Sequence, residues 1–588
     1  MIRASDTIAQ RRRLGYFTAV LVVFGVVLVG RLFYLQILQH GRYLAQATRE
    51  HTRKYEIPAR RGELYVHDGD GISPLALNQT LKLLYADPRY VGDKAEAARK
   101  LAAITGDDAA GYQSKLEHGI EYVELAQRVA PEAAARIQAL NLAGVALADR
   151  DYRTYPEGQL AAQTLGFVNA DGTGQYGVEG YLNDALAGTP GRLAAKTDTH
   201  GIPIATANNV VKPPVDGANY LLTIDRNVQA MAESELKGQV EKARAKSGSI
   251  VVLDPSNGAV RAMASYPTFD PNHYSQVSDY SVFVNQVTSS QFEPGSGMKA
   301  FTMAAGLDQG KVKPDTTYDD PFCYQVDDRK VCDAEGDKPG KGKTMTVVLR
   351  DSLNTGVMYV LRLLGGDKDN FTLNGKKLLY SYFTKHFGFG TRTGIEQANE
   401  AAGSISQPSN NAGNNVTYAN MSFGQGMNVT MIQMVAAMAA VANGGKLYQP
   451  HVVDGVMQAD GTVAQAKPKL IADHVMSPSA IADLNQMLQV VVQHGSGYRI
   501  YENPGNKNYK IAGKTGTAQI PKLDGTGYID GANIGSFVGY APADHPKFVM
   551  MVRINEPGIS GYAETTTVPV FGDMTAWLFK YYGIPPST

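Results

Sequence analysis

One apolar segment near the N-terminus stands out from the rest of the chain. Residues 14–30 read LGYFTAVLVVFGVVLVG without a charge, and apolar residues continue past Arg31 to Leu38. A helix over residues 14–38 spans about 37 Å, which is enough to cross the roughly 30 Å hydrocarbon core of a bilayer. Arg31 lies near one end, where its side chain can reach the interface. No later apolar run is long enough to span, so the pattern predicts one transmembrane helix.

A cleaved signal peptide is the alternative for this segment. Such a peptide has an apolar region of about 7–15 residues with a small-x-small cleavage site close behind. The nearest such triplet, residues 45–47, lies well downstream, so we expect a retained anchor. Charge leaves its orientation open, because basic residues both precede and follow it: Arg3, Arg11, Arg12 and Arg13 before, and Arg42, Arg49, Arg53 and Lys54 after.

The region after the anchor alternates between strand-like and helix-like patterns. Residues 61–65 alternate like a strand that ends in the turn cluster 67–71, and the Ala- and Leu-rich residues 94–148 predict short helices. Residues 210–217 contain two adjacent prolines, which exclude a helix and remove two sheet donors. We therefore expect a linker there, which divides a mixed domain at 39–212 from a second domain at 213–588.

The second domain opens with a strand, a helix and another strand, predicted over residues 221–225, 226–245 and 249–253. This order predicts an α+β or α/β enzyme domain that runs almost to the C-terminus. Two polar stretches within it, residues 319–344 and 399–415, are expected to be loops.

Composition narrows the range of functions. At roughly 100–200 residues per domain, the chain is long enough for three to five domains. Lys and Arg total 56, as do Asp and Glu, and the resulting zero net charge argues against a nucleic-acid partner, because phosphate binding needs a basic excess. Two cysteines exclude a Cys-rich metal site, and the 11 histidines form no close ligand pair. We expect neither a metal site nor nucleic-acid binding.

Three short motifs in the second domain carry the candidate chemistry. They are S-x-x-K at Ser296–Lys299, S-x-N at Ser352–Asn354 and K-T-G at Lys514–Gly516. Each motif alone is weak, because residues 234–237, 409–411 and 246–248 match similar patterns by chance.

Sequence context separates the three motifs from the chance matches. Ser296 follows a Pro-Gly turn and opens an apolar helical pattern, so it would face the positive end of a helix dipole with Lys299 one turn later. Ser352 precedes an apolar stripe at helical spacing, and Lys514 stands in a strand-like run of small residues. Ser234 instead lies on a charged helical face, where a solvated serine is the simpler interpretation.

With these motifs and their flanks, the chain resembles a class B penicillin-binding protein, a peptidoglycan D,D-transpeptidase. Asn354 and the Phe-Glu-Pro-Gly sequence before Ser296 resemble the septal, FtsI-type branch in particular. Gly297 departs from the family, which more often has Thr there, and residues 319–344 are an insertion without a general counterpart. The flanking segments that carry the resemblance cover nearly the whole chain: residues 31–36, 60–62, 155–158, 165–168, 177–180, 423–426 and 442–445.

The resemblance implies an α+β fold in three parts. A single N-terminal transmembrane helix (14–38) is followed by an elongated mixed pedestal of the dimerisation type (39–212). The transpeptidase domain (213–588) has a central antiparallel sheet packed with helices, as in serine β-lactamases. Peptidoglycan lies outside the cytoplasmic membrane, so residues 1–13 are expected to be a cytoplasmic tail and the catalytic domain to be extracytoplasmic.

The resemblance also assigns roles to the motif residues. Ser296 is the expected nucleophile, and Lys299 is its base, which requires a pKa lowered by burial and by a second cation, Lys514. Ser352 is expected to pass a proton to the leaving amine, and Asn354 to orient Lys299 and the substrate amide. The N–H groups of Ser296 and of the strand residue at 517 would form the oxyanion hole. The residues expected to bind the substrate, together with Lys514, are Thr515, Gly516 and Thr517.

This activity implies particular ligands and partners. The expected ligands are peptidoglycan stem peptides ending in D-Ala-D-Ala and β-lactam antibiotics, without a metal or organic cofactor. The expected partners are a SEDS-type glycosyltransferase and divisome membrane proteins. Three alternatives stay open: an elongation-type transpeptidase, a serine β-lactamase or β-lactam sensor, and a scaffold that activates a glycosyltransferase.

Cys323 and Cys332 lie in the polar stretch 319–344, on the oxidising side of the membrane in this orientation. A turn between them can bring their Cα atoms within about 4.4–6.8 Å, so we expect a disulfide. Two free thiols, or a metal pair without other ligands, are the alternatives.

Overall fold

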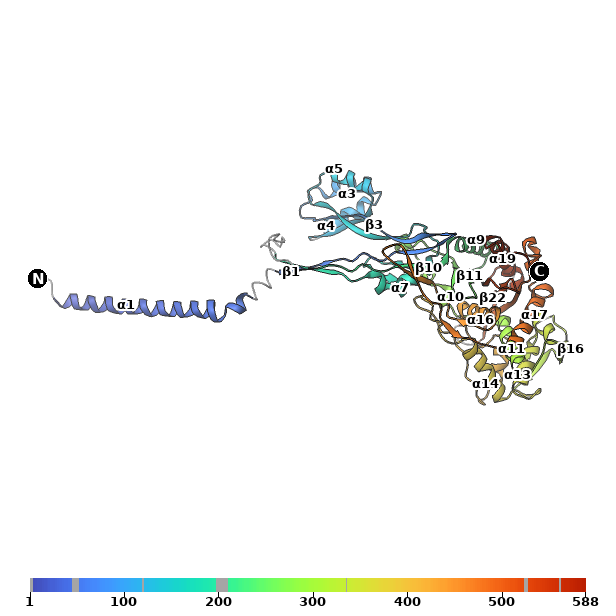
Figure 1. Ribbon diagram of the computed structural model, residues 1–588. Coiled ribbons are helices and arrows are strands. Elements are labelled where there is room, and N and C mark those ends of the chain that lie inside the picture. Colours follow the sequence, from blue (N-terminus) through green and yellow to red (C-terminus); the bar gives the residue numbers. More distant parts are fainter. Residues whose placement is uncertain are drawn as a thin grey trace. The chain divides into compact units, whose positions relative to one another are not determined.

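The computed structural model describes residues 4–44, 52–118, 121–196, 210–334, 336–522, 527–559 and 562–587 (Figure 1). The chain divides into two compact units. The first comprises residues 1–60 with 188–216, and the second comprises residues 61–187 with 217–588. All three motifs lie in the second unit.

The first unit begins with a long helix. Helix α1 (Ala4–Phe33) continues as a π-helical turn at Tyr34–Leu38, and its apolar side chains from Leu14 onward are exposed. The helical stretch Gln10–Leu38 is long enough to cross a membrane, and an 18-residue window within it has a mean hydropathy of 2.2. It contains the predicted span 14–38, and no other helix in the described ranges is both as long and as apolar.

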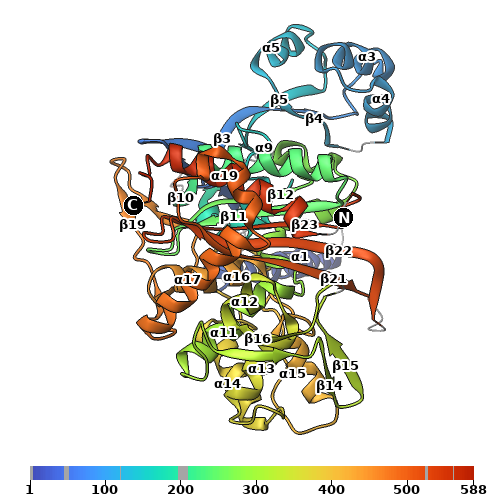
Figure 2. The ribbon, with the colours of Figure 1, turned by 90° about the vertical axis from the view of Figure 1, so that its right-hand side faces the viewer.

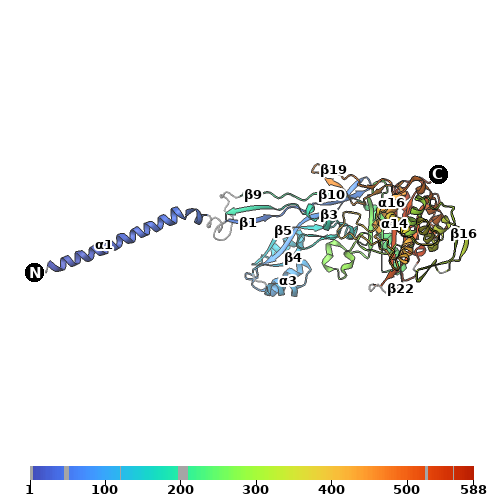
Figure 3. The same cartoon turned by 90° about the horizontal axis from the view of Figure 1, so that it is seen from below.

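A narrow antiparallel sheet completes the first unit, with the strand order β1-β8-β9 (Figure 3). Its strands are β1 (Thr52–Ile57), β8 (Gly191–Lys196) and β9 (Val210–Lys212). The predicted linker at 210–217 is therefore wrong for its first three residues, because they pair with β8. The ladder ends at Pro213, which has no backbone N–H to donate.

Residues 86–148 of the second unit form a small subdomain, which we call the head. Its core includes Leu101, Leu116 and Ile137, and Asp93 caps the first helix by accepting a hydrogen bond from the Glu96 N–H at 2.9 Å. The short helices predicted here are confirmed. The elements of the head are α3 (Lys94–Thr105), α4 (Ala109–His118), β4 (Val123–Val129) and α5 (Pro131–Ala139).

A mixed sheet joins segments from both sides of the predicted boundary at residue 212. Its strand order is β19-β18-β10-β2-β3-β4, and β5 also pairs with β3. These strands are β2 (Leu64–Asp68), β3 (Gly71–Ala86), β5 (Val145–Thr154), β10 (Asn219–Asp225), β18 (Val453–Met457) and β19 (Val463–Gln465). The predicted strand 221–225 is part of β10, which runs parallel to β2 and antiparallel to β18. The boundary itself stays a prediction.

The central sheet of the second unit has the order β12-β11-β23-β22-β21 and is antiparallel throughout (Figure 2). Its strands are β11 (Ser247–Leu253), β12 (Val260–Tyr266), β21 (Ala512–Pro521), β22 (Tyr528–Ala541) and β23 (Phe548–Asn555). Along β11, Ile250 and Val252 belong to one hydrophobic cluster, and Val251 and Leu253 belong to another. Because successive strand residues point to opposite faces, this sheet is buried on both sides.

Helices cover both faces of the central sheet. Helices α9 (Arg226–Ala243) and α19 (Val568–Tyr581) pack on one face, and α16 (Met431–Ala442) packs on the other (Figure 2). The first turn of α16 is closed by a capping box between Thr430 and Gln433. The expected α+β fold, with a central antiparallel sheet packed by helices, is confirmed.

Residues 319–344 are not the loop that their polarity predicts. They take part in two strand pairs, β13 (Thr317–Asp320) with β16 (Gly340–Thr344), and β14 (Cys323–Val326) with β15 (Arg329–Cys332). Only a few side chains here are apolar and buried, among them Val326 and Val331, so the pattern lacks the alternation that marks a strand. Residues 399–415 do lack helices and regular strands until α15 begins.

Shorter elements fill the remainder of the second unit. In the N-terminal part they are α6 (Ala162–Leu165), β6 (Phe167–Val168), β7 (Gly174–Gln175), α7 (Gly177–Tyr181) and α8 (Asn183–Ala187). In the C-terminal part they are α10 (Gln286–Ser289), α11 (Lys299–Asp308), α12 (Met345–Arg350), α13 (Asn354–Leu364), α14 (Leu373–Ser381), α15 (Asn414–Ser422), β17 (Leu447–Tyr448), β20 (Leu470–Ala472), α17 (Pro478–His494) and α18 (Ala563–Thr566).

Candidate active site

Ser296 lies at the start of a helix, as its motif predicts. Residues Gly295–Met298 form a 3-10 turn that leads directly into α11. Gly295 has a φ of +52°, and a Cβ there would lie 2.5 Å from the Thr517 carbonyl oxygen, so this turn requires glycine. Ser296 itself is half-buried, and the helix presents the positive end of its dipole to the serine hydroxyl.

A buried carboxylate holds the segment before Ser296. Glu293 accepts hydrogen bonds from the Gly426 N–H at 2.8 Å and from the Tyr528 hydroxyl at 3.1 Å. Burial raises the pKa of Glu293, although these two donors oppose the shift. The flanking segment 423–426 is therefore tied to the turn that carries the candidate nucleophile.

Lys299 is a buried lysine in contact with the second motif. The residue is only 1% exposed. Its Nζ donates to the backbone carbonyl of Ser352 and to the Ser352 hydroxyl, the latter at 3.2 Å. Burial, and then the charge of Lys514, hold the pKa of Lys299 well below its usual value, while Asp333 and Asp337 oppose the shift. A general base needs a pKa lowered in this direction.

Ser352 lies between two lysine amines. Its Oγ is 3.2 Å from Nζ of Lys299 and 2.9 Å from Nζ of Lys514, so its proton can exchange with either amine. Its φ of +61° is in the left-handed region, which a non-glycine residue rarely adopts. Such backbone strain costs about 1–3 kcal/mol and is concentrated at functional positions.

Lys514 comes from β21, the edge strand of the central sheet. It is fully buried, and burial lowers its pKa to about 7, against a smaller opposing effect of Glu564. Its Nζ also donates to the carbonyl and hydroxyl oxygens of Thr515, both at 3.3 Å. The Ser496 hydroxyl, in the turn after α17, is 2.6 Å from the Thr515 hydroxyl. One amine and two hydroxyl groups thus converge where a carboxylate could bind.

The outer edge of β21 lies against the nucleophile turn. A Cβ at Gly516 would be 2.7 Å from the Pro294 carbonyl oxygen, so the glycine of the K-T-G motif permits this approach. Thr517, the next residue, is exposed, whereas Thr515 and Gly516 are buried. Because no further strand of the described ranges pairs with this edge, its backbone groups are available to an extended ligand.

Asn354 contacts the insertion. Its side-chain amide donates to the Cys332 carbonyl oxygen at 2.8 Å, and its expected contact with Lys299 stays a prediction. Cys332 is bonded to Cys323, its partner across the β14–β15 pair. The predicted disulfide is confirmed, and the free-thiol and metal-pair alternatives are wrong.

The residues matched by chance lie elsewhere. Ser234 and Lys237 are exposed on α9, as a solvated helical face predicts. Glu179, in the flanking segment 177–180, is fully buried in the N-terminal part of this unit, 2.7 Å from Arg61 and 2.6 Å from Arg153, and so has a structural role. Within the described residues, no group of three or more His, Cys, Asp or Glu side chains is placed to bind a metal ion.

Sequence reasoning missed three residues that surround the motifs: Glu293, Asp333 and Ser496. Glu293 belongs to the recognised Phe-Glu-Pro-Gly lead-in, but nothing in its sequence context predicts that it binds residue 426. Ser496 is far from Thr515 along the chain and carries no motif. Only Asp333 had a local signal, since it directly follows a cysteine of the insertion.

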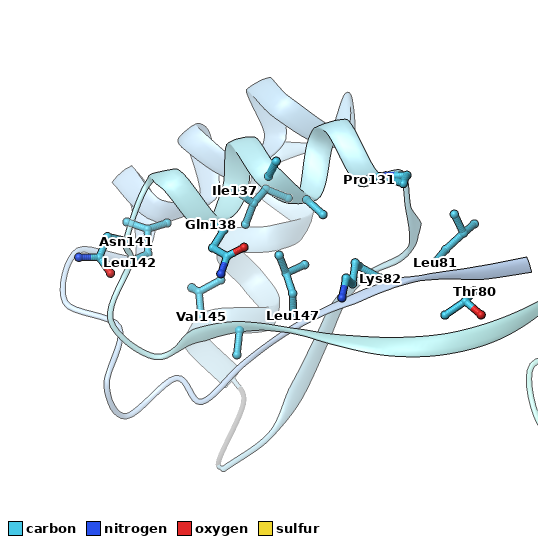
Figure 4. A pocket seen from close by; sticks show the side chains of 13 residues that line it. Thr80, Leu81, Lys82, Pro131, Ile137, Gln138, Asn141, Leu142, Val145 and Leu147 are labelled. Carbon is cyan, nitrogen blue, oxygen red and sulfur yellow. The ribbon is translucent and has the colours of Figure 1, made fainter.

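A cavity of about 540 Å³ lies in and beside the head, between α5 and strands β3 and β5 (Figure 4). Most of its lining residues are apolar, with Leu81, Ile137 and Leu147 among them, and Lys82 is the one charged residue among the described residues that line it. None of the motif residues lines it, so the candidate chemistry does not belong to this cavity.

Comparisons with known proteins identify the family of this chain. Residues 248–576 match the family model of the penicillin binding protein transpeptidase domain, and residues 56–222 match that of the penicillin-binding protein dimerisation domain. Stage V sporulation protein D of Bacillus subtilis is 32% identical over 100% of this chain and 88% of its own length. Peptidoglycan D,D-transpeptidase FtsI of Escherichia coli is 28% identical over 95% of this chain and 90% of its own length.

A solved structure shares the fold over most of the chain. The crystal structure of penicillin binding protein 3 from Mycobacterium tuberculosis, complexed with aztreonam, is 26% identical with a TM-score of 0.67. The match covers 91% of this chain and 98% of the other. The likeness in fold therefore extends over most of both regions that the family models match.

Proposed function

This chain belongs to the penicillin-binding proteins, and we propose that it is a peptidoglycan D,D-transpeptidase that works through an acyl-enzyme on Ser296. One observation carries the proposal: the Ser352 hydroxyl lies between the buried amines of Lys299 and Lys514, beside the helix start that presents Ser296. The relative named as a D,D-transpeptidase and the neighbour in complex with aztreonam support a stem-peptide substrate and inhibition by β-lactams.

The acylation step uses only side chains and backbone groups of this chain. Neutral Lys299 takes the proton of Ser296, whose oxygen attacks the carbonyl carbon of the penultimate D-Ala. The carbon–nitrogen bond to the terminal D-Ala then breaks, and Ser352 passes a proton to the leaving amine with replacement from a lysine. The N–H groups of Ser296 and Thr517 stabilise the oxyanion, and one such donor contributes about 10²–10³ in rate.

Transfer completes the reaction. An amine of a neighbouring stem peptide attacks the acyl-enzyme, gives up its proton through Lys299, and releases Ser296 as the cross-link forms. Thr515, Thr517 and Lys514 hold the terminal carboxylate of the donor. A β-lactam acylates the same serine, but its leaving group stays attached to the acyl portion, so the adduct is released slowly.

Labelling with a fluorescent penicillin tests this proposal. We expect one adduct, mapped to Ser296 by mass spectrometry, and no adduct in Ser296→Ala. Ser234→Ala is the matched control, because Ser234 has the same motif on an exposed helix, and it should label normally. An adduct on Ser234, or undiminished labelling of Ser296→Ala, would refute the assignment, and rapid release of the label would favour a β-lactamase.

The two lysines should fail differently when each is replaced by alanine. Lys299→Ala should abolish acylation while leaving binding of a substrate carboxylate, because this residue is one turn from Ser296. Lys514→Ala should weaken both, because it faces Ser352 and Thr515. Equal, complete loss of non-covalent substrate binding in both variants would contradict this division of roles.

We propose that residues 1–13 are cytoplasmic, that residues 14–38 span the membrane and that the rest of the chain is extracytoplasmic, where peptidoglycan lies. The exposed apolar stretch Gln10–Leu38 supports the span. Protease added to intact spheroplasts should digest the catalytic domain and spare a tag at the N-terminus. Digestion of the tag with protection of the catalytic domain would reverse the orientation.

A SEDS-type glycosyltransferase and divisome membrane proteins are the proposed partners, engaged by residues 14–38 and by the pedestal at 39–212. The pedestal carries none of the three motifs, which leaves its surface free for a partner. A truncated protein that starts near residue 215 should therefore fail to activate the glycosyltransferase. Activation equal to that of the full chain would refute this interface.

We assign the chain to the septal branch and not to the elongation branch. Asn354 in the second motif and the similarity to a protein named FtsI support this assignment. A fluorescent fusion should gather at division sites, and depletion should produce filamentous cells. Rounded cells with normal septa would favour the elongation-type alternative.

A further inference from the structure

The insertion at 319–344 packs against the second motif. The disulfide between Cys323 and Cys332 closes its β14–β15 hairpin at the base. The hairpin is held next to the disulfide as well, because the guanidinium of Arg362 on α13 stacks over the Tyr324 ring at 3.9 Å. The insertion is therefore fixed to α13, the helix that begins at Asn354.

Two consecutive residues of the insertion contact two consecutive residues of α13. The Cys332 carbonyl accepts from the Asn354 amide at 2.8 Å. The neighbouring Asp333 carboxylate accepts from the Thr355 N–H at 2.9 Å and from the Thr355 hydroxyl at 2.8 Å. Asp333 thus caps the N-terminal end of α13, where a negative charge is favoured.

A second carboxylate, Asp320, meets the same hydroxyl but has its own counter-ion. Thr355 Oγ1 is 2.8 Å from Asp320, which also forms an ion pair with Lys343 at 2.6 Å. Tyr318 contributes its hydroxyl to this group at 3.1 Å from Thr355. Asp333 has no such ion pair among the residues that the structure describes. The lysine whose charge lowers the pKa of Asp333 is Lys299.

We propose that Asp333 is a positioning residue of the transpeptidase, which fixes the start of α13 beside Ser352 and supplies a negative counter-charge to the catalytic base Lys299. The inference deepens the proposed function and rests on it. Asp333 touches neither the substrate nor the reacting atoms. Its effect passes through Thr355 and Asn354 by hydrogen bonds, and to Lys299 by its field.

The charged groups around Lys299 determine in which direction its pKa should move when the charge of Asp333 is removed. Lys514 lowers the pKa of Lys299 in addition to burial, and Asp333 and Asp337 raise it, Asp333 more strongly. Around Asp333 itself, burial and Asp320 raise its pKa, whereas Thr355 and Lys299 lower it. Asp337 in turn faces Lys299, Lys343 and Asp351. Removal of the Asp333 charge should therefore lower the pKa of Lys299 further.

Asp333→Asn is the informative substitution, because it removes the charge and keeps the hydrogen bonds. Its amide oxygen can still accept from the Thr355 N–H, and Thr355 can turn its hydroxyl proton toward Asp320. The rate of acylation by a fluorescent penicillin is measured on the full chain from about pH 5 to 10. We expect the acid limb of the rate profile to move to lower pH. At a pH on this limb, the rate should rise tenfold for each pH unit by which the limb moves.

Asp328→Asn is the matched control. Asp328 is on the same hairpin with a side chain that is 79% exposed, so its profile should coincide with that of the parent. Thr355→Ser should also match the parent, whereas Thr355→Val should lower the rate, because Asp333 loses a hydrogen-bond donor. If Asp333→Asn does not fold, Thr355→Val against Thr355→Ser still tests the positioning role.

The outcomes separate this inference from the proposed function. An Asp333→Asn profile with an unmoved acid limb, or a limb moved to higher pH, would overturn the inference while labelling of Ser296 stands. A uniformly lower rate without movement would also overturn it, because that result reports only a structural contact. Absence of labelling in the parent protein would overturn the proposed function itself.

Discussion

Replacement of Lys514 by methionine should stabilise the protein while it abolishes catalysis. Lys514 is fully buried, and its pKa falls from 10.5 in the unfolded chain to about 7 in the fold. The fold therefore opposes the charged form that the free side chain prefers at neutral pH. Methionine has a similar length, fills the same space and carries no charge to bury.

The magnitude follows from the pKa values of the two states. At about 1.4 kcal/mol per pH unit, the full shift corresponds to about 5 kcal/mol, and at pH 7 about 4 kcal/mol of this penalty applies. The methionine loses the hydrogen bonds to Ser352 and Thr515, which offsets about 1–2 kcal/mol. A net gain of about 2–3 kcal/mol remains, which in a compact unit of roughly 500 residues raises Tm by about 2–3 °C.

The pH dependence gives the stronger test. Between about pH 7 and 10.5 the unfolded chain binds more protons at this lysine than the folded chain, so the stability of the parent rises with pH. Lys514→Met lacks this dependence, so its advantage should shrink to about 0–1 kcal/mol at pH 9. Near pH 10.5 the lost hydrogen bonds outweigh the remaining penalty, and the variant should be less stable than the parent by about 1 kcal/mol.

Thermal unfolding at pH 7, 8 and 9 measures both the gain in stability of Lys514→Met and its decrease with pH. Lys246→Met is the matched control, because Lys246 has a side chain that is 73% exposed and should change stability by less than about 0.5 kcal/mol. A Lys514→Met protein less stable than the parent at pH 7, or an advantage that does not fall with pH, would refute the reasoning.

Three further predictions test the scaffold around the site. Glu179→Ala leaves the buried Arg153 and the half-buried Arg61 without their carboxylate partner and should cost about 3–5 kcal/mol, measured as a lower denaturation midpoint. Gly295→Ala should abolish penicillin labelling with normal circular dichroism, because the new Cβ meets the Thr517 carbonyl; normal labelling would refute the tight turn. Cys323 and Cys332 should resist alkylation until reduced, and their joint replacement by alanine should cost about 2–3 kcal/mol.

The sequence predicted most accurately those features that depend on neighbours along the chain. The positions of Ser296 at a helix start, Ser352 before α13 and Lys514 on a strand all follow from local periodicity and turn residues. The strand 221–225 and the helix after it were located within two residues for the same reason. Local pattern also identified the anchor, since its side chains need no partner within the protein.

Features that depend on distant partners could not be predicted in this way. The strands in residues 319–344 are stabilised by pairing, by a disulfide and by contacts to α13, and their polar sequence shows no alternation. The sequence of residues 210–212 predicts a linker and not strand β9, because their pairing depends on β8, which is distant along the chain. Ser496 reaches Thr515 only because α17 packs beside β21, and no spacing rule encodes that contact.

The same physical terms explain why the site needs so large a scaffold. Two lysines are buried within reach of one hydroxyl, and each costs free energy because it is kept from water. Ser352 adds backbone strain in the same place. The central sheet, buried on both faces, provides the surplus of apolar burial that tolerates these costs. A lysine that lies free in solution at pH 7 is protonated and cannot act as a base, so the burial that destabilises the fold is also what makes Lys299 reactive.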